Sequence, residues 1–199
     1  MVINLAVFAL QLLIPSVNDV IALQPQGSQN FNIFQYLTAC FAHGGFLHIL
    51  FNMFALVSFG PQLERRFGSN KFLYFYLVTG VLANIFWHYI SNPIVPALGA
   101  SGALFGVLAV FTILNPETKL SIIFLPFFGF KAKWLFGIVL LVELVLVIMG
   151  TQDGIGHVVH ISGAIIGTIY YVLFLKGKSG SVHKRAGVGI NAMRKRQGK

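Results

Sequence analysis

The side chains that could do chemistry in this chain lie within otherwise apolar sequence. Ser101 stands in the segment Gly-Ala-Ser-Gly-Ala-Leu-Phe-Gly, from Gly99 to Gly106. A serine hydroxyl becomes a nucleophile when a base within hydrogen-bond reach accepts its proton. Gly102 and Gly106 form a small-xxx-small pair, which would let a second helix bring such a base close. The alternative is a packing serine whose hydroxyl bonds back to its own helix.

A second segment supplies a candidate base. His160, Gly163, Ala164 and Gly167 follow i, i+3, i+4, i+7 spacing, which places the imidazole on the close-packed stripe of a helix. His157 lies one turn earlier, nearer the outer surface. The alternative is a pair of structural or metal-binding histidines. Two histidines at i, i+3 make a weak metal site, and we expect no cysteine or carboxylate neighbour to complete it.

A third segment, His-Gly-Gly-Phe-Leu-His-Ile-Leu-Phe-Asn at 43–52, carries two hydrogen-bond donors. His48 and Asn52 are four residues apart, so they share one face of a helix. An imidazole and a carboxamide on one face can both donate to an oxyanion as it develops. The alternative is an interhelical hydrogen-bonding pair that only holds a bundle together.

The elements that position these residues are expected to be membrane helices. Hydrophobic residues make up 56% of the 199, and charged residues only 10%. Soluble domains average about 25% charged residues, so this chain has too little polar surface to stay in water. The single cysteine, Cys40, excludes an internal disulfide framework.

The expected fold class is an all-α, polytopic membrane protein with a bundle of six transmembrane helices. Several stretches fall short of the ~20 residues of a full span, and flanking residues would extend them. A further apolar segment, Leu120–Phe130, contains Pro126 and Gly129 and is interpreted as an interfacial connector, although it could lengthen a neighbouring helix. The six apolar stretches are Val2–Ile14, Phe46–Phe59, Phe72–Ile90, Leu98–Leu114, Trp134–Met149 and Ile155–Leu175.

The positions of the basic residues agree with six spans. All 14 Lys and Arg residues then lie on one side, in the loops 60–71 and 115–133 and after Phe174. The positive-inside rule predicts both termini in the cytoplasm. No aromatic residue follows Phe174, so bases have no stacking platform in the basic tail, and we expect lipid contact and no nucleic-acid partner. The predicted organisation is a membrane domain at 1–176 and a basic, disordered cytoplasmic tail at 177–199.

Helix direction links the three segments. With six spans, the second, fourth and sixth all begin at the outer face. His48, Ser101 and His160 each lie within about one turn of such a start, and so ~5–10 Å below the outer boundary. We therefore expect one cavity open to outside water, which hydrolysis requires.

In this order and in a six-span chain, the motifs resemble the rhomboid family of intramembrane proteases over about residues 31–175. The matching pieces are the segment at 43–52, Gly60-x-x-x-Glu64-x-x-x-Gly68, Gly-Ala-Ser-Gly at 99–102 and His-Val-Val-His-Ile-Ser-Gly at 157–163. The resemblance implies an integral protein of a membrane, expected to be the bacterial inner (plasma) membrane. It also implies cleavage of single-span membrane proteins.

The resemblance assigns roles residue by residue. Ser101 is then the nucleophile and His160, not His157, the general base, acting as a dyad without metal or organic cofactor. The oxyanion and substrate-binding set comprises His48, Asn52, Gly99 and Phe105, with the ring of Phe105 stacked beneath the base. Phe105 stands where many relatives have tyrosine.

Two acidic residues lie near these segments. Glu143 is inside the fifth apolar stretch, where a charge costs at least ~2.5 kcal/mol on insertion scales. It is a candidate for substrate gating, but we favour a protonated carboxyl bonded to a neighbouring helix. Asp153 is near His157 in sequence.

Two other functions remain open at this stage. One is a catalytically inactive relative that binds membrane helices. The other is a small transporter or proton relay built on His48, His157, His160 and Glu143, although no repeat symmetry is visible.

Overall fold

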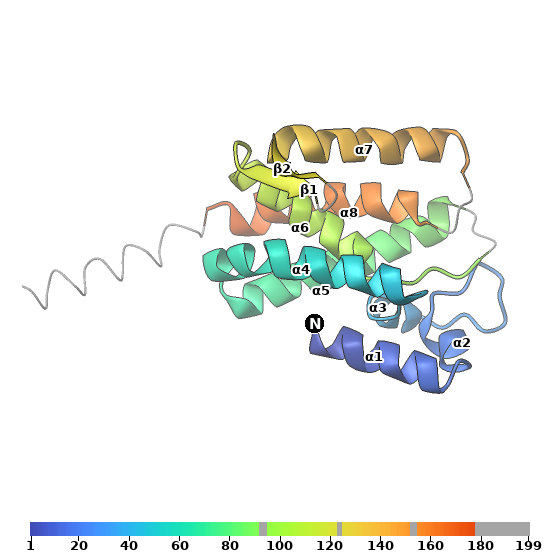
Figure 1. Ribbon diagram of the computed structural model, residues 1–199. Helices are drawn as coiled ribbons and strands as arrows, with labels where there is room; N and C mark the ends of the chain where they lie inside the picture. Colours follow the sequence, from blue (N-terminus) through green and yellow to red (C-terminus); the bar gives the residue numbers. More distant parts are fainter. Residues whose placement is uncertain (92–94, 123–124, 152–154, 178–199) are drawn as a thin grey trace, which may run out of the picture.

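The structure is a bundle of apolar helices (Figure 1). A computed structural model describes residues 1–91, 95–122, 125–151 and 155–177. The main helices are α1 (Val2–Leu13), α4 (Phe46–Phe67), α5 (Ser69–Ile90), α6 (Ser101–Leu114), α7 (Ala132–Ile148) and α8 (His157–Tyr170), which continues as a π-helix, η1 (Tyr171–Leu175). Two short helices, α2 (Val17–Ile21) and α3 (Gln35–Thr38), lie between α1 and α4. Each main helix falls within or around a predicted apolar stretch, so the mostly helical fold is confirmed.

Three helical stretches in the described residues are long and apolar enough to cross a membrane. These are α4, α5 and the continuous stretch of α8 and η1, with 22, 22 and 19 residues. The apolar helices α1 and α6 have 12 and 14 residues, and α7 has 17. A full span needs about 20 residues. The expectation of six crossings therefore stays a prediction.

The connector after α6 forms strands, so the all-α expectation is wrong there. β1 (Lys119–Ile122) pairs antiparallel with β2 (Leu125–Lys131), in the register Lys119 with Lys131 and Leu120 with Phe130. Proline inside this segment disfavours a helix, while its Ile and Phe residues favour strands. The segment therefore extends neither α6 nor α7.

Charges hold the hairpin against the start of α7. The Glu117 carboxylate forms ion pairs with Lys131, at 2.8 Å, and with Lys133. Hydrogen bonds from Lys131 and Lys133 lower the pKa of Glu117 to about 2. These groups are exposed, so the ion pairs add little stability and mainly fix where β2 turns into α7.

The two ends of the bundle differ in what they hold. Figure 1 shows the β1–β2 hairpin, the α4–α5 turn and η1 at one end, and α2 and α3 at the other. The basic residues of the described loops therefore gather at one end. This arrangement agrees with the charge partition on which the predicted orientation depends.

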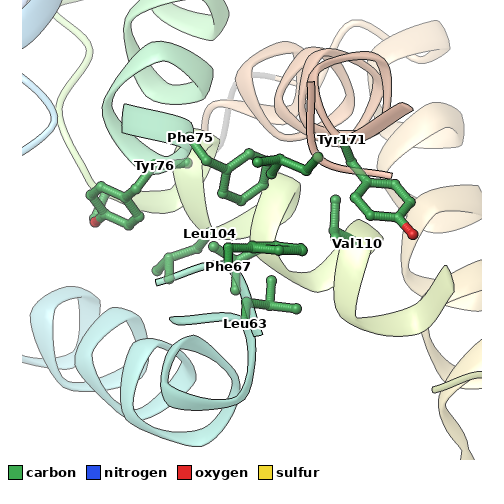
Figure 2. Packing of buried hydrophobic residues seen from close by; sticks show 11 residues of the cluster. Leu63, Phe67, Phe75, Tyr76, Leu104, Val110 and Tyr171 are labelled. Atoms are coloured by element: carbon green, nitrogen blue, oxygen red, sulfur yellow. The ribbon is translucent and has the colours of Figure 1, made fainter. Parts of the chain in front are cut away.

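A hydrophobic core packs α4, α5, α6 and η1 together (Figure 2). Phe75 of α5 is fully buried, and Leu104 of α6 is 3% exposed. Lipid tails are as apolar as leucine, so close van der Waals contact, and not exclusion of water, holds such a core. Its labelled members are Leu63, Phe67, Phe75, Tyr76, Leu104, Val110 and Tyr171.

The α6 and α8 helices are in close backbone contact, and this contact depends on glycine. A Cβ atom on Gly163 would overlap the carbonyl oxygen of Gly102. A Cβ atom on Gly167 would lie 2.5 Å from Cα of Gly106. The two backbones therefore touch along two glycine pairs, as small-xxx-small motifs allow.

We predict that Gly163→Ala destabilises the protein by about 3 kcal/mol, because the added methyl meets backbone that cannot move aside. Thermal unfolding in detergent should show a clearly lower Tm. Gly137→Ala on α7 is the matched control, since a Cβ atom there has no atom within 4 Å other than its chain neighbours and the nearby backbone of its own helix. Equal Tm values for the two variants would contradict the α6–α8 packing.

Candidate active site

Ser101 is the first residue of α6 and is half-buried. The chain reaches it through Gly99, whose φ of 133° is a backbone conformation that L side chains rarely adopt. The Gly99 N–H donates to the Ala39 carbonyl at 2.9 Å, which ties this turn to the segment before α4. The start of α6 is thus fixed by backbone contacts on the outer-loop side.

His48, the third residue of α4, points at the same turn. Its Nδ1 accepts a hydrogen bond from the Gly44 N–H at 3.4 Å, so in the neutral ring Nε2 carries the proton. A Cβ atom on Gly99 would lie 2.8 Å from His48 Nε2 and 3.6 Å from Ser101 Oγ. The Nε2–H donor and the serine hydroxyl therefore flank Gly99 from two helices.

His160 lies over the face of α6 that carries Ser101. Its ring stacks on Phe105, with centroids 4.2 Å apart and planes at 5°. Phe105 is four residues after Ser101, one turn further on the same face. The structure thus brings Ser101, His48, Phe105 and His160 together.

Asn52 lies one turn after His48 on α4 and is 8% exposed. Its Nδ2 is buried and has no hydrogen-bond partner among the described residues. A buried amide donor without a partner costs roughly 1–3 kcal/mol. This cost makes Asn52 a candidate for binding an oxygen that arrives only with a substrate.

The loop that leads into α4 is held by α1. Gln11 donates to the His43 carbonyl at 3.1 Å, and the His43 N–H donates to the Gln11 side-chain oxygen at 3.0 Å. The His43 ring packs edge-on against His48, with centroids 5.1 Å apart. Burial and the nearby His48 lower the pKa of His43 to about 4, so this ring is neutral at pH 7. These contacts orient the start of α4.

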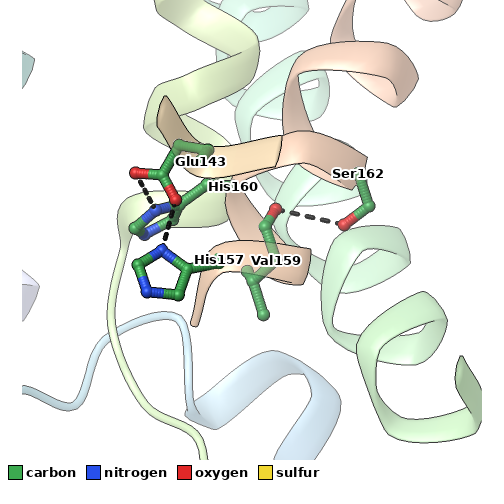
Figure 3. Close-up of polar contacts among 5 residues, drawn as sticks. All are labelled: Glu143, His157, Val159, His160 and Ser162. Atoms are coloured by element: carbon green, nitrogen blue, oxygen red, sulfur yellow. Dashed lines mark hydrogen bonds and ion pairs between the residues drawn. The ribbon is translucent and has the colours of Figure 1, made fainter. Parts of the chain in front are cut away.

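The Glu143 carboxyl group contacts a neighbouring helix, as the sequence analysis favoured, and this contact is with the two histidines of α8 (Figure 3). Glu143 of α7 lies with Oε2 2.6 Å from His157 Nδ1 and Oε1 3.0 Å from His160 Nδ1. The first contact is a hydrogen bond, while the second has ion-pair distance without full hydrogen-bond alignment. The expectation that no carboxylate accompanies the two histidines is therefore wrong, because the partner comes from another helix. Asp153 lies outside the described residues.

These three residues are also a set that could hold a metal ion. One ligand atom from each of Glu143, His157 and His160 lies within 4.8 Å of the others. Two ligands of a tetrahedral zinc ion lie about 3.3 Å apart, given bonds of about 2.0 Å. The Glu143–His157 and Glu143–His160 separations of 2.6 Å and 3.0 Å are shorter and fit a shared proton better. The absence of a metal cofactor stays a prediction.

Comparison with known proteins gives the family. The model of the rhomboid domain matches residues 30–177. The chain belongs to the rhomboid family. It is 34% identical over 142 residues to the mitochondrial presenilin-associated rhomboid-like protein of Homo sapiens, covering 69% of this chain and 37% of that protein. It is 32% identical over 142 residues to the rhomboid protease GlpG of Haemophilus influenzae, covering 71% of this chain and 70% of that protein.

A third relative is the putative rhomboid protease YdcA of Bacillus subtilis, 36% identical over 89 residues that cover 44% of each chain. The chain spans little more than a third of the presenilin-associated relatives, at 37% of their length. Together with the apolar helices, the family makes this rhomboid an integral membrane protein.

We predict that Gly99→Ala reduces covalent labelling of Ser101 by a fluorophosphonate at least tenfold. The added methyl would displace the His48 ring and strain a backbone with positive φ, at a cost of about 1–3 kcal/mol. The comparison variant is Gly45→Ala, where the backbone is extended and an added Cβ has open space. If Gly99→Ala is labelled as fast as Gly45→Ala, the reactivity of Ser101 does not depend on how the Gly99 turn positions the His48 ring.

Proposed function

We propose that this rhomboid is an intramembrane serine protease that hydrolyses peptide bonds in or near the transmembrane segments of single-span membrane proteins. One observation carries the proposal. The His160 ring stacks on Phe105, one turn from Ser101 on the same helix face. A hydroxyl and an imidazole from two helices can then act as nucleophile and base.

The proposed reaction begins when Ser101 Oγ attacks the carbonyl carbon of the scissile bond and its proton passes to His160 Nε2. The tetrahedral intermediate collapses as the imidazolium returns that proton to the leaving amine. A water molecule then gives a proton to the same imidazole and attacks the acyl carbon. The imidazolium returns that proton to Ser101 Oγ as the bond to the acyl group breaks, which releases a carboxylic acid and restores the enzyme. No metal or organic cofactor takes part in these steps.

The oxyanion of the intermediate has three proposed donors. Nε2–H of His48 is one, and the unpartnered Nδ2 of Asn52 is another. The backbone N–H of Ser101 is the third, since the first N–H groups of a helix have no carbonyl of their own helix to bond. Donors fixed before the charge develops stabilise the transition state without reorganising.

Cleavage of a single-span membrane protein by the purified protein in liposomes tests this function. We predict that the wild type produces two fragments, whereas Ser101→Ala and His160→Ala reduce the rate at least 10³-fold, because neither retains an activated nucleophile. His157→Ala should retain measurable cleavage. A folded wild type that cuts no member of a substrate panel would favour the inactive relative that only binds membrane helices. Full activity of His160→Ala with loss in His157→Ala would reassign the base.

We also propose that the chain crosses the bacterial inner membrane six times with both termini in the cytoplasm. Support comes from the charge partition and from the α4–α5 turn and the hairpin lying at the same end of the bundle (Figure 1). The active site then opens toward the outside.

Cysteine labelling in intact bacterial cells tests the orientation. Native Cys40 is 2% exposed and should stay unlabelled by an impermeant maleimide. Asn30→Cys, in the segment between α2 and α3, should label from outside. Asn70→Cys, at the α4–α5 turn, should label only after the cells are permeabilised, because the basic loops stay inside. Both positions are exposed. The reverse pattern would overturn the orientation.

A further inference from the structure

Glu143 is an acidic side chain within an apolar helix, and the groups around it explain why a charge is tolerated there. The α7 helix buries only Ala132 among its described residues, and most of its large apolar side chains are exposed. The Glu143 side chain is nevertheless only 13% exposed, and its carboxylate faces the two histidines of α8 (Figure 3). A charge at such a depth is retained when it has polar partners.

The carboxylate divides its two oxygens between two imidazoles. Oε2 lies 2.6 Å from Nδ1 of His157, and Oε1 lies 3.0 Å from Nδ1 of His160. The side chain of His157 is 5% exposed, so the 2.6 Å contact is shielded from water and holds the carboxylate in place. His157 thus fixes the carboxylate that faces His160.

Protonation of the His160 nitrogen that faces Glu143 determines whether the other ring nitrogen can accept a proton. In a neutral imidazole one nitrogen carries the proton and the other accepts one. A carboxylate at Nδ1 keeps the proton there, so the lone pair is on Nε2, at the far side of the ring. The Phe105 stack sets the ring plane, and the carboxylate sets the rotation of the ring within that plane.

We propose that Glu143 is a positioning residue for His160, which makes the reaction centre a Ser101–His160–Glu143 triad with its carboxylate on α7. This inference rests on the proposed protease function. When the Ser101 proton passes to Nε2, Glu143 stays ionised and stabilises the imidazolium by its charge. The proton then leaves with the amine, so Glu143 neither gains nor loses one.

The alignment of the contact fits this role. The His160 Nδ1 contact has the distance of an ion pair without full hydrogen-bond alignment. Catalytic hydrogen bonds are often poorly aligned without substrate and tighten in the complex. Because His157 already holds the other oxygen, a small rotation of the His160 ring is enough to align it.

The experiment compares Glu143→Gln, Glu143→Asp and His157→Gln with wild type in the full chain, reconstituted in liposomes. For each, the second-order rate of fluorophosphonate labelling is measured together with kcat, KM and Tm. Leu141→Ala is the control on α7, because that side chain is 60% exposed on the apolar surface of the helix.

We expect Glu143→Gln to lower both the labelling rate and kcat by about 100-fold, with KM within twofold of wild type. Loss of the charge removes the preferred tautomer and the stabilisation of the imidazolium, whereas substrate binding is untouched. Glu143→Asp keeps the charge, so its labelling rate and kcat should be at least tenfold higher than those of Glu143→Gln. His157→Gln should lower kcat about tenfold, because it frees the carboxylate without removing it. Leu141→Ala should behave as wild type.

The outcomes separate this inference from the function on which it rests. A wild type that is folded but never labels contradicts the protease function itself. A wild type that labels, together with a Glu143→Gln variant that labels equally fast, overturns the positioning role alone. The positioning role is also overturned if Tm and KM of Glu143→Gln change together and Glu143→Asp does not recover activity. Such a result would show that the carboxylate serves only the structure. If Glu143→Gln does not fold, the test uses His157→Gln and Glu143→Asp instead. A kcat equal to that of wild type in both variants overturns the positioning role.

Discussion

The backbone contact between α6 and α8 is the constraint on which the rest of the site depends. Gly102 meets Gly163, and Gly106 meets Gly167, with no room for a single added carbon. At this separation the His160 ring can lie flat on Phe105, a turn from the serine. Side chains of ordinary size at these glycines would move the helices apart and take the imidazole out of reach of α6. The same four residues thus set both the packing of α6 against α8 and the place of the His160 imidazole over α6.

The sequence predicted much of this arrangement for physical reasons. Apolar stretches long enough to cross a bilayer favour helices, in which every backbone polar group finds a partner within its own segment. Glycine spacing predicted the close contact of α6 and α8, and the shared starts of α4, α6 and α8 predicted that His48, Ser101 and His160 would meet. In the structure His48 and Ser101 flank Gly99, and His160 stacks on Phe105 one turn from Ser101, while the roles of these residues in catalysis remain proposals.

Other features could not be read from spacing. Glu143 joins His157 and His160 from a helix that is separate in sequence, so only a three-dimensional arrangement reveals the pairing. The available signal was an acidic residue in an apolar stretch. The hairpin was missed because its apolar composition suits both a strand and an interfacial segment. The described lengths of α1 and α6, at 12 and 14 residues, show that apolar stretches need not become full-length helices.

The central claim is that the Ser101 hydroxyl is activated by the His160 imidazole. Peptide mass spectrometry after reaction with a fluorophosphonate tests it most directly, because the site of the adduct identifies the nucleophile. We predict a single adduct on Ser101 in wild type and none in an otherwise folded His160→Ala variant. An adduct on another residue, or equal modification of Ser101 in both proteins, would contradict it.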